Sequence, residues 1–291
     1  MRWTPGGTSG DIEDRRNDSG GGGFGGGGGG FGGIHIGIGG LLVLLVLSFV
    51  FKRDLISPLL NSGAVSTENG APARPPDPAR DAAENKEVQF VSFVLDDAQD
   101  TWTKMINGYR HAKLVLFRDA IQSACGGAQT ASGPFYCPGD EKVYLDLAFF
   151  DELDQRFHAS GDFARAYVVA HELGHHVQKL LGTEAKMRQA QQQNPSRAND
   201  LSVRLELQAD CYAGVWGHST EQRAIIDQSD IQSGLNAAAS VGDDRLQKMA
   251  TGTVMPEKFT HGTSAQRAKW LQTGLDSGRI DACDTFSVAQ P

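Results

Sequence analysis

Two histidines four residues apart, with a glutamate directly after the first, could do metal chemistry. His171, Glu172 and His175 form an HExxH motif. Residues four apart on an α-helix lie on one face, so both imidazoles could bind one Zn²⁺. Glu172 adjoins them and could act as general base on a zinc-activated water in peptide hydrolysis. The motif therefore predicts a single catalytic zinc ion; a helix with ordinary histidines is the alternative.

Two carboxylates four residues apart follow the motif, at Glu206 and Asp210. A catalytic zinc ion needs a third protein ligand and an open position for water, and Glu206 is the candidate ligand. Asp210 lies one helical turn further on and could accept a hydrogen bond from the Nδ1–H of His171, fixing its tautomer. Alone, the two carboxylates would be typical of a solvated helix face. Gly214 and Gly217 continue this face, and such small residues would let the helix approach the metal-binding helix closely.

Two helices must position these side chains. Apolar or small residues recur every three or four positions around the HExxH motif, which predicts a helix over residues 162–181. Asp162 is a suitable N-cap for this helix, and Gly182 is suited to end it. A second helix, predicted over residues 199–216, carries both carboxylates. We therefore expect the two helices to meet at the metal site.

The surrounding pattern indicates a helix-rich α+β domain with a small antiparallel sheet. Residues 112–117 form a short apolar segment typical of a strand. Residues 135–146 are predicted to be strand, turn and strand, with a Pro-Gly-Asp turn between the strands. Further helices are predicted over residues 231–249 and 264–275.

Composition narrows the classes of function. Lys and Arg number 27 against 35 Asp and Glu, and the resulting net charge of −8 and pI near 5.5 argue against a protein that wraps nucleic acid. Hydrophobic residues make up 40% of the chain, which is enough for a packed core. Of the 36 glycines, 18 fall in residues 1–40. Residues 1–33 are therefore predicted to be a flexible, glycine-rich tail.

An uncharged apolar run follows this tail. Residues 34–51 are 18 residues long, which favours a single uncleaved transmembrane helix at the short end of the usual range. A buried core helix and a cleaved signal peptide are the alternatives, although 33 residues precede the run and no small-residue cleavage site directly follows it. The proline- and alanine-rich residues 52–87 are typical of a linker. The folded domain is then predicted over residues 88–291.

Four cysteines lie at positions 125, 137, 211 and 283, and their spacing matches no CxxC metal module. An even count favours disulfides, which form in oxidising compartments. Three pairings are open. We favour Cys125–Cys137, which closes a short loop, and Cys211–Cys283, which ties the C-terminal region to the helix of Glu206. Such disulfides would place the domain outside the cytoplasm, at the inner membrane of the cell; four reduced thiols in a cytoplasmic domain are the alternative.

The run HELGHH followed by ELQAD resembles the HExxH…ExxxD arrangement of the gluzincin metallopeptidases. The chain is also similar to a bacterial family of neutral zinc metallopeptidases, through its glycine-rich start and the stretches GPFYCPGDEKVYLD, YVVAHELGHHVQ and LELQADCYAGVW. The resemblance spans residues 88–285 and implies a zincin-like fold. It implies zinc binding by His171, His175 and Glu206, with Glu172 as the general base.

The resemblance suggests two further roles. A strand beside the metal helix pairs with extended peptides in gluzincin-like enzymes, so residues 135–146 could bind substrate by strand addition; an ordinary hairpin is the alternative. Integral-membrane relatives carry a late histidine ahead of a helix with an arginine, which matches His261 and Arg267. His261 could stabilise the oxyanion of the transition state. A capping or surface histidine is the alternative, and Tyr144 or Tyr212 could donate instead.

These features predict a membrane-anchored zinc peptidase that acts on a peptide or protein substrate. The competing hypothesis is a zinc-stabilised scaffold or adaptor of the cell envelope, with little or no peptidase activity. The intact Glu172 favours the enzyme, because a structural zinc ion needs no general base. No nucleic acid partner is expected, and substrate identity and oligomeric state stay open.

Overall fold

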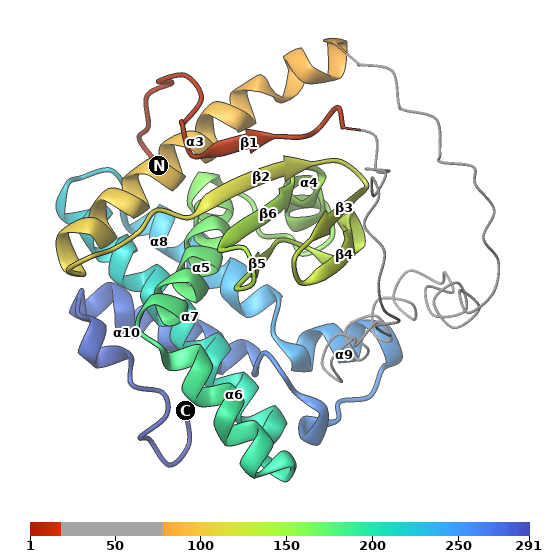
Figure 1. The fold of residues 1–291 in the computed structure, drawn as a ribbon, viewed down its shortest axis with the longest axis vertical. Helices are drawn as coiled ribbons and strands as arrows, with labels where there is room; N and C mark the ends of the chain where they lie inside the picture. The colour runs from red at the N-terminus through yellow and green to blue at the C-terminus, as the bar shows by residue number, and fades with distance from the viewer. Residues whose placement is uncertain (19–77) are drawn as a thin grey trace, which may run out of the picture.

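The computed structural model describes residues 1–18 and 78–291 (Figure 1). Its strands are β1 (Ile12–Asp14), β2 (Lys113–Phe117), β3 (Ala120–Ser123), β4 (Gly126–Gln129), β5 (Phe135–Cys137) and β6 (Lys142–Asp146). Its α-helices are α3 (Pro78–Met105), α4 (Ala148–Gln155), α5 (Asp162–Leu180), α6 (Thr183–Gln193), α7 (Ala198–Gln222), α8 (Gln228–Ser240), α9 (Asp243–Thr251) and α10 (Ser264–Ser277). The described chain is a helix-rich α+β fold with a small sheet, as predicted.

Four strands form the main sheet in the order β1-β2-β6-β5. β2 runs parallel to both β1 and β6, and β5 and β6 are antiparallel. The prediction of an antiparallel sheet is therefore wrong for this sheet, which is mixed; β3 and β4 form a separate antiparallel pair. The turn between β5 and β6 is a local signal, whereas parallel neighbours need a long connection that no local pattern reveals.

The main sheet packs on both faces, because side chains alternate along β2 and β6. One set of side chains joins the large core formed with α3, α4 and α5, and the other set packs against the β3–β4 pair. The first set is Leu114, Leu116, Val143 and Leu145, and the second is Val115, Phe117 and Tyr144. Figure 1 shows α5 running beneath the sheet. The sheet thus supports the helix that carries the HExxH motif.

Residues 1–18 are an integral part of this fold. Ile12 pairs with Leu114 as β1 adds to the edge of β2. The Trp3 ring packs on Phe90 of α3 with ring centroids 5.3 Å apart. The prediction of a flexible tail is therefore wrong for these residues. Residues 78–87, predicted to be linker, form the start of α3; the rest of the predicted tail and linker lies outside the described residues.

No helix in the described ranges 1–18 and 78–291 is long and apolar enough to cross a membrane. The predicted transmembrane helix, residues 34–51, lies outside those ranges. The sheet still constrains that prediction, because β1 precedes this run and its partner β2 follows it. A single crossing would place two paired strands on opposite sides of a membrane. The predicted single crossing and the β1–β2 pairing therefore differ in the side of the membrane that they assign to residues 1–18.

The helix boundaries follow the prediction closely at the motif and less closely after it. α5 begins at Asp162 with Gly161 as its N-cap, and it ends before Gly182, whose φ of 75° is left-handed. The predicted helix over 231–249 is two helices, α8 and α9. They separate at Gly242, where an added Cβ would lie 2.2 Å from the backbone N of Ser264. The helix α6 was not predicted.

Glycines set how closely the site helices approach. A Cβ on Gly174 of α5 would lie 2.9 Å from the carbonyl oxygen of Ala209, so this glycine lets α5 and α7 cross in contact. Gly214 was predicted to bring α7 close to the metal-binding helix, but it lies at the contact with α10. A Cβ there would lie 2.1 Å from the carbonyl oxygen of Leu271, on α10. The small residues of α7 therefore serve its contact with α10 as well as with α5.

Candidate metal centre

The donor atoms of His171, His175 and Glu206 lie within 4.8 Å of one another. His171 Nε2 is 3.2 Å from Glu206 Oε2, and His175 Nε2 is 3.6 Å from Glu206 Oε1. The two histidines come from successive turns of α5, and the glutamate comes from α7, which crosses α5 at Gly174. The structure therefore brings together the three residues that the sequence suggested as metal ligands. Two imidazoles and one carboxylate suit Zn²⁺.

His171 is held by a buried network on the side away from Glu206. Its Nδ1 is 2.8 Å from Asp210 Oδ1, the contact expected from the sequence. Tyr167 donates its hydroxyl proton to the same oxygen at 2.6 Å, and Arg267 donates to both carboxylate oxygens at 2.9 Å. An ionised carboxylate only accepts, so His171 carries its proton on Nδ1 and directs the lone pair of Nε2 toward Glu206.

Carboxylates dominate the electrostatics of the centre. Burial opposes the charge of His171, but Asp210 and Glu206 outweigh it and raise the pKa of this imidazole to about 10. Burial also opposes the charge of Glu206, yet His175 and His171 hold its pKa well below the ordinary range. The cluster thus favours positive charge among its donors. A divalent cation binds the same nitrogen lone pairs that protons occupy. Surroundings that favour protonation of these imidazoles therefore also favour a metal ion.

Glu172 lies beside the candidate metal ligands. Its side chain follows His171 on α5 and is 8% exposed. Within the described ranges, its carboxylate has no hydrogen bond or ion pair to the chain. It is close enough to His175 to help raise the pKa of that imidazole, an effect opposed by burial and led by Glu206. A carboxylate beside a metal site and without a protein partner is available as a proton acceptor.

His261 precedes α10 and is held by Asp243, the first residue of α9. Asp243 Oδ2 accepts hydrogen bonds of 2.7 Å from the backbone N–H groups of Thr260 and His261, while Oδ1 lies 3.2 Å from His261 Nδ1. Burial lowers the pKa of His261, but Asp243 and the charge of Glu206 raise it overall. With Nδ1 turned to Asp243, Nε2 carries a proton to donate only in the imidazolium form of the ring, which the raised pKa favours.

The other polar candidates lie elsewhere. Tyr144 donates to Asp140 at 2.7 Å, and Tyr212 packs edge-on against Trp102. His176 accepts from the Tyr136 hydroxyl at Nδ1 and donates from Nε2 to a backbone carbonyl at 2.6 Å. His176 therefore ties α5 to β5 and is not among the three residues grouped at the candidate metal centre.

Sequence reasoning missed three residues that support the centre: Tyr167, Gln178 and Asp243. Tyr167 lies four residues before His171, and Gln178 lies three residues after His175, so helical spacing could have identified both. Asp243 comes from another helix and gave no local signal. Arg267 was noted as a feature of the resemblance, but its contact with Asp210 was not foreseen.

Both favoured disulfides are present. Cys125 bonds to Cys137 beside the β3–β4 pair, and Cys211 bonds to Cys283, with Cα atoms 5.8 and 5.6 Å apart respectively. The second bond joins the helix of Glu206 to the short 3₁₀ turn Ile280–Cys283. The C-terminal region is therefore covalently tied to the helix that carries the third candidate ligand.

The helix-rich α+β fold thus gathers an HExxH helix and a glutamate of a second helix around one point. The chain belongs to the family described as "Putative neutral zinc metallopeptidase", whose profile matches residues 1–286. It is 44% identical over 293 residues to "Uncharacterized protein YpfJ" of Escherichia coli strain K12, covering 98% of this chain and 99% of that protein.

A mycobacterial relative matches a shorter part of the chain. "Uncharacterized protein Rv2575" of Mycobacterium tuberculosis is 43% identical over 217 residues, covering 70% of this chain and 73% of its own length. No solved structure matches the chain significantly. The family name implies zinc, and the His171, His175 and Glu206 cluster agrees with that implication.

Proposed function

We propose that this protein is a zinc-dependent peptidase in which His171, His175 and Glu206 hold the metal ion. The observation that carries the proposal is the convergence of both Nε2 atoms on Glu206, with Glu172 beside them and free of protein partners. A Zn²⁺ bound there supplies a Lewis acid for the scissile carbonyl and lowers the pKa of a water molecule. A site built only to hold zinc would have no use for the free carboxylate of Glu172.

The remaining catalytic and binding roles are assigned to Glu172, His261 and the strand β5. Glu172 accepts the proton of the attacking water and passes it to the leaving amine. His261, held by Asp243, donates in its imidazolium form from Nε2 to the oxyanion that develops on the substrate. β5 is the last strand of the main sheet, and Tyr136 joins it to α5 through His176. An extended peptide therefore binds along this edge by strand addition, beside the metal helix.

The experiment is cleavage of a mixed peptide library by the full chain, with and without a chelator, followed by zinc addition. Glu172→Gln preserves the size of the side chain but cannot accept a proton, so we expect normal zinc binding and a loss of about 10²–10⁴-fold in cleavage rate. Glu257→Gln, at an exposed position, is the matched control and should cleave normally. Undiminished cleavage by Glu172→Gln would refute the mechanism. Zinc binding without chelator-sensitive cleavage by the wild type would favour the scaffold hypothesis.

We also propose that the domain works in an oxidising compartment outside the cytoplasm. The two disulfides support this location, because such bonds persist where thiols are not kept reduced. β1 and β2 share one sheet, so residues 1–18 belong in that compartment too. Membrane attachment through residues 34–51 stays a prediction from the sequence.

A thiol-labelling experiment tests the compartment of the domain and the compartment of residues 1–18. Asp18→Cys places a thiol on an exposed position of the N-terminal segment, and an alkaline phosphatase fused after residue 291 reports an oxidising environment. In spheroplasts we expect a membrane-impermeant maleimide to label position 18 while the phosphatase is active. Labelling that needs lysis, with an active phosphatase, would place the segment and the domain on opposite sides.

A further inference from the structure

The second histidine of the HExxH motif is held by an amide instead of a carboxylate. His175 Nδ1 lies 2.9 Å from Oε1 of Gln178, a side chain on the same helix that has no exposed surface. Gln178 Nε2 points the other way and donates to the Leu205 carbonyl oxygen on α7 at 2.7 Å. A neutral buried side chain therefore connects His175 of α5 to the backbone of α7, the helix that carries Glu206.

The Leu205 carbonyl decides which way this amide faces. A carbonyl oxygen only accepts hydrogen bonds, so the nitrogen of Gln178 must lie toward Leu205 and its oxygen toward His175. An amide oxygen also only accepts, and His175 must therefore carry its proton on Nδ1. The lone pair of His175 then lies on Nε2, which faces Glu206 at 3.6 Å. The protein thus fixes the metal-binding tautomer of His175 without adding a charge.

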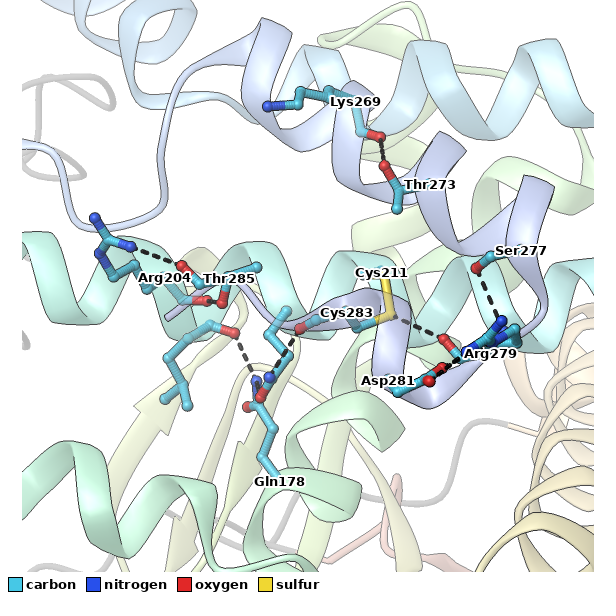
Figure 2. Close-up of a disulfide and its surroundings, with 12 residues drawn as sticks. Gln178, Arg204, Cys211, Lys269, Thr273, Ser277, Arg279, Asp281, Cys283 and Thr285 are labelled. Carbon is cyan, nitrogen blue, oxygen red and sulfur yellow. Dashed lines mark hydrogen bonds and ion pairs between the residues drawn. A yellow bond between two sulfur atoms is a disulfide. The ribbon is translucent and has the colours of Figure 1, made fainter. Parts of the chain in front are cut away.

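A second amide extends the chain of hydrogen bonds. Gln178 Nε2 also donates to Oε1 of Gln208 at 3.2 Å, and Gln208 Nε2 donates to the Cys283 carbonyl oxygen at 2.9 Å. Cys283 is bonded to Cys211, less than one turn after Gln208 on α7. Figure 2 shows Gln178 reaching from its helix toward Cys283 and the disulfide. The far end of the chain of amides is therefore covalently anchored.

We propose that Gln178 and Gln208 form an amide relay that positions His175 for metal binding, with the Cys211–Cys283 disulfide holding its far end. Both amides are buried, so neither can exchange its partner for bulk water. This inference rests on the metal site of the proposed function and does not depend on peptide cleavage. Gln178 and Gln208 are positioning residues, because they act on the metal site through His175.

The test is zinc affinity of the full chain, measured by competition with a chromophoric chelator. Gln178→Met removes the acceptor of His175 at similar size, and we expect zinc to bind about 10–100-fold more weakly. Gln178→Glu keeps an acceptor for His175 but loses the donor bonds to Leu205 and Gln208, so we expect a loss of zinc affinity smaller than that of Gln178→Met, with a lower free energy of unfolding. Gln208→Met should weaken zinc binding less than Gln178→Met, because it acts one bond further from His175.

The two disulfides provide a matched pair of variants. Cys211→Ala/Cys283→Ala releases the anchored end of the relay, and we expect weaker zinc binding. Cys125→Ala/Cys137→Ala removes a bond of the same type beside the β3–β4 pair, and zinc affinity should not change. A proton NMR signal from His175 Nδ1–H, protected from exchange in the zinc-loaded wild type, should persist in Gln178→Glu and disappear in Gln178→Met.

Unchanged zinc affinity in Gln178→Met would overturn the relay. Equal losses in Gln178→Met and Gln178→Glu would also overturn it, because they would indicate a structural effect without positioning. If Gln178→Met fails to fold, Gln208→Met decides, because unchanged zinc affinity in that variant would overturn the relay. Normal zinc affinities with no peptide cleavage by the wild type would refute only the proposed function, whereas a wild type that binds no zinc would refute both.

Discussion

Arg267 and Arg118 each pair with carboxylates, but they lie in different surroundings and do different work. Arg267 binds both oxygens of Asp210, a side chain with no exposed surface, next to the metal centre. Arg118, at the end of β2, binds Asp81 and Glu84, whose side chains are 25% and 15% exposed, and Asn17 of the N-terminal segment. Arg267 and Asp210 form an inner network that orients the candidate metal ligand His171. Arg118, Asp81, Glu84 and Asn17 form an outer network that attaches residues 1–18 to the domain.

The comparison shows what burial changes in an ion pair. Burial disfavours the charge of Asp210, yet Arg267 and His171 lower its pKa to about 2. The same two effects oppose each other at Glu84, where burial raises the pKa while Arg118 and Arg16 lower it overall. Water can replace a lost partner of Glu84 but not of Asp210. The inner pair is therefore the more costly one to break.

The largest effect should come from Arg267→Met, which leaves Asp210 buried without its cationic partner. We expect a loss of about 3–5 kcal/mol in the free energy of unfolding, measured by urea denaturation. Arg279→Met, which breaks an exposed pair with Asp281, is the control and should have no measurable effect. If Arg267→Met destabilises the protein no more than this control, the inner pair contributes nothing to stability.

Arg118→Met should have the next largest effect. It removes the hydrogen bonds to Asp81, Glu84 and Asn17, and we expect a loss of about 1–3 kcal/mol because water reaches the abandoned carboxylates. Limited proteolysis should then cleave residues 1–18 faster than in the wild type. Arg15→Met lies in the same segment but loses only a surface pair with Asp18, so its cleavage rate should stay unchanged. Equal proteolysis of both variants would contradict the role of Arg118.

The two networks also differ in how far the sequence predicted them. Asp210 was found because helical spacing from Glu206 and the chemistry of a zinc histidine both pointed to it. The strand β1 was missed because it is three residues long and gains its stability from pairing with β2, about a hundred residues away in the chain. A polar, glycine-rich start without a repeated apolar pattern gives no local signal for such a strand.

The same reasoning applies to the metal centre. The spacing of His171, Glu172 and His175 sets their relative positions on one helix, so a local pattern was sufficient. Gln178 lies on that helix too, but a glutamine has many neutral roles, and its role depends on the Leu205 carbonyl of another helix. Contacts between helices are set by packing, for example by the close crossing at Gly174, and single-sequence patterns do not specify them.

A smaller effect is expected at the edge of the inner network. Tyr167→Phe removes one of the donors to Asp210 and leaves Arg267 and His171 in place. We expect a loss of about 1 kcal/mol in the free energy of unfolding, with zinc still bound. Isothermal zinc titration and urea denaturation of the same sample would measure both quantities. A loss as large as that of Arg267→Met would mean that the hydroxyl contributes as much as the arginine to holding Asp210.

The smallest effect should appear on acidification of the outer network. The pKa of Glu84 is lower in the folded protein than its ordinary value of 4.5, since its arginine partners outweigh burial. Its contribution to stability is therefore complete above about pH 4.5 and is lost as the pH falls through the lowered pKa. Glu84→Gln removes this titration, so the difference in unfolding free energy between wild type and variant should shrink as the pH drops below that value. A constant difference across this range would show that the charge of Glu84 does not stabilise the fold, whereas Arg118→Met should reduce the pH dependence of the difference without abolishing it, because Arg16 still binds Glu84.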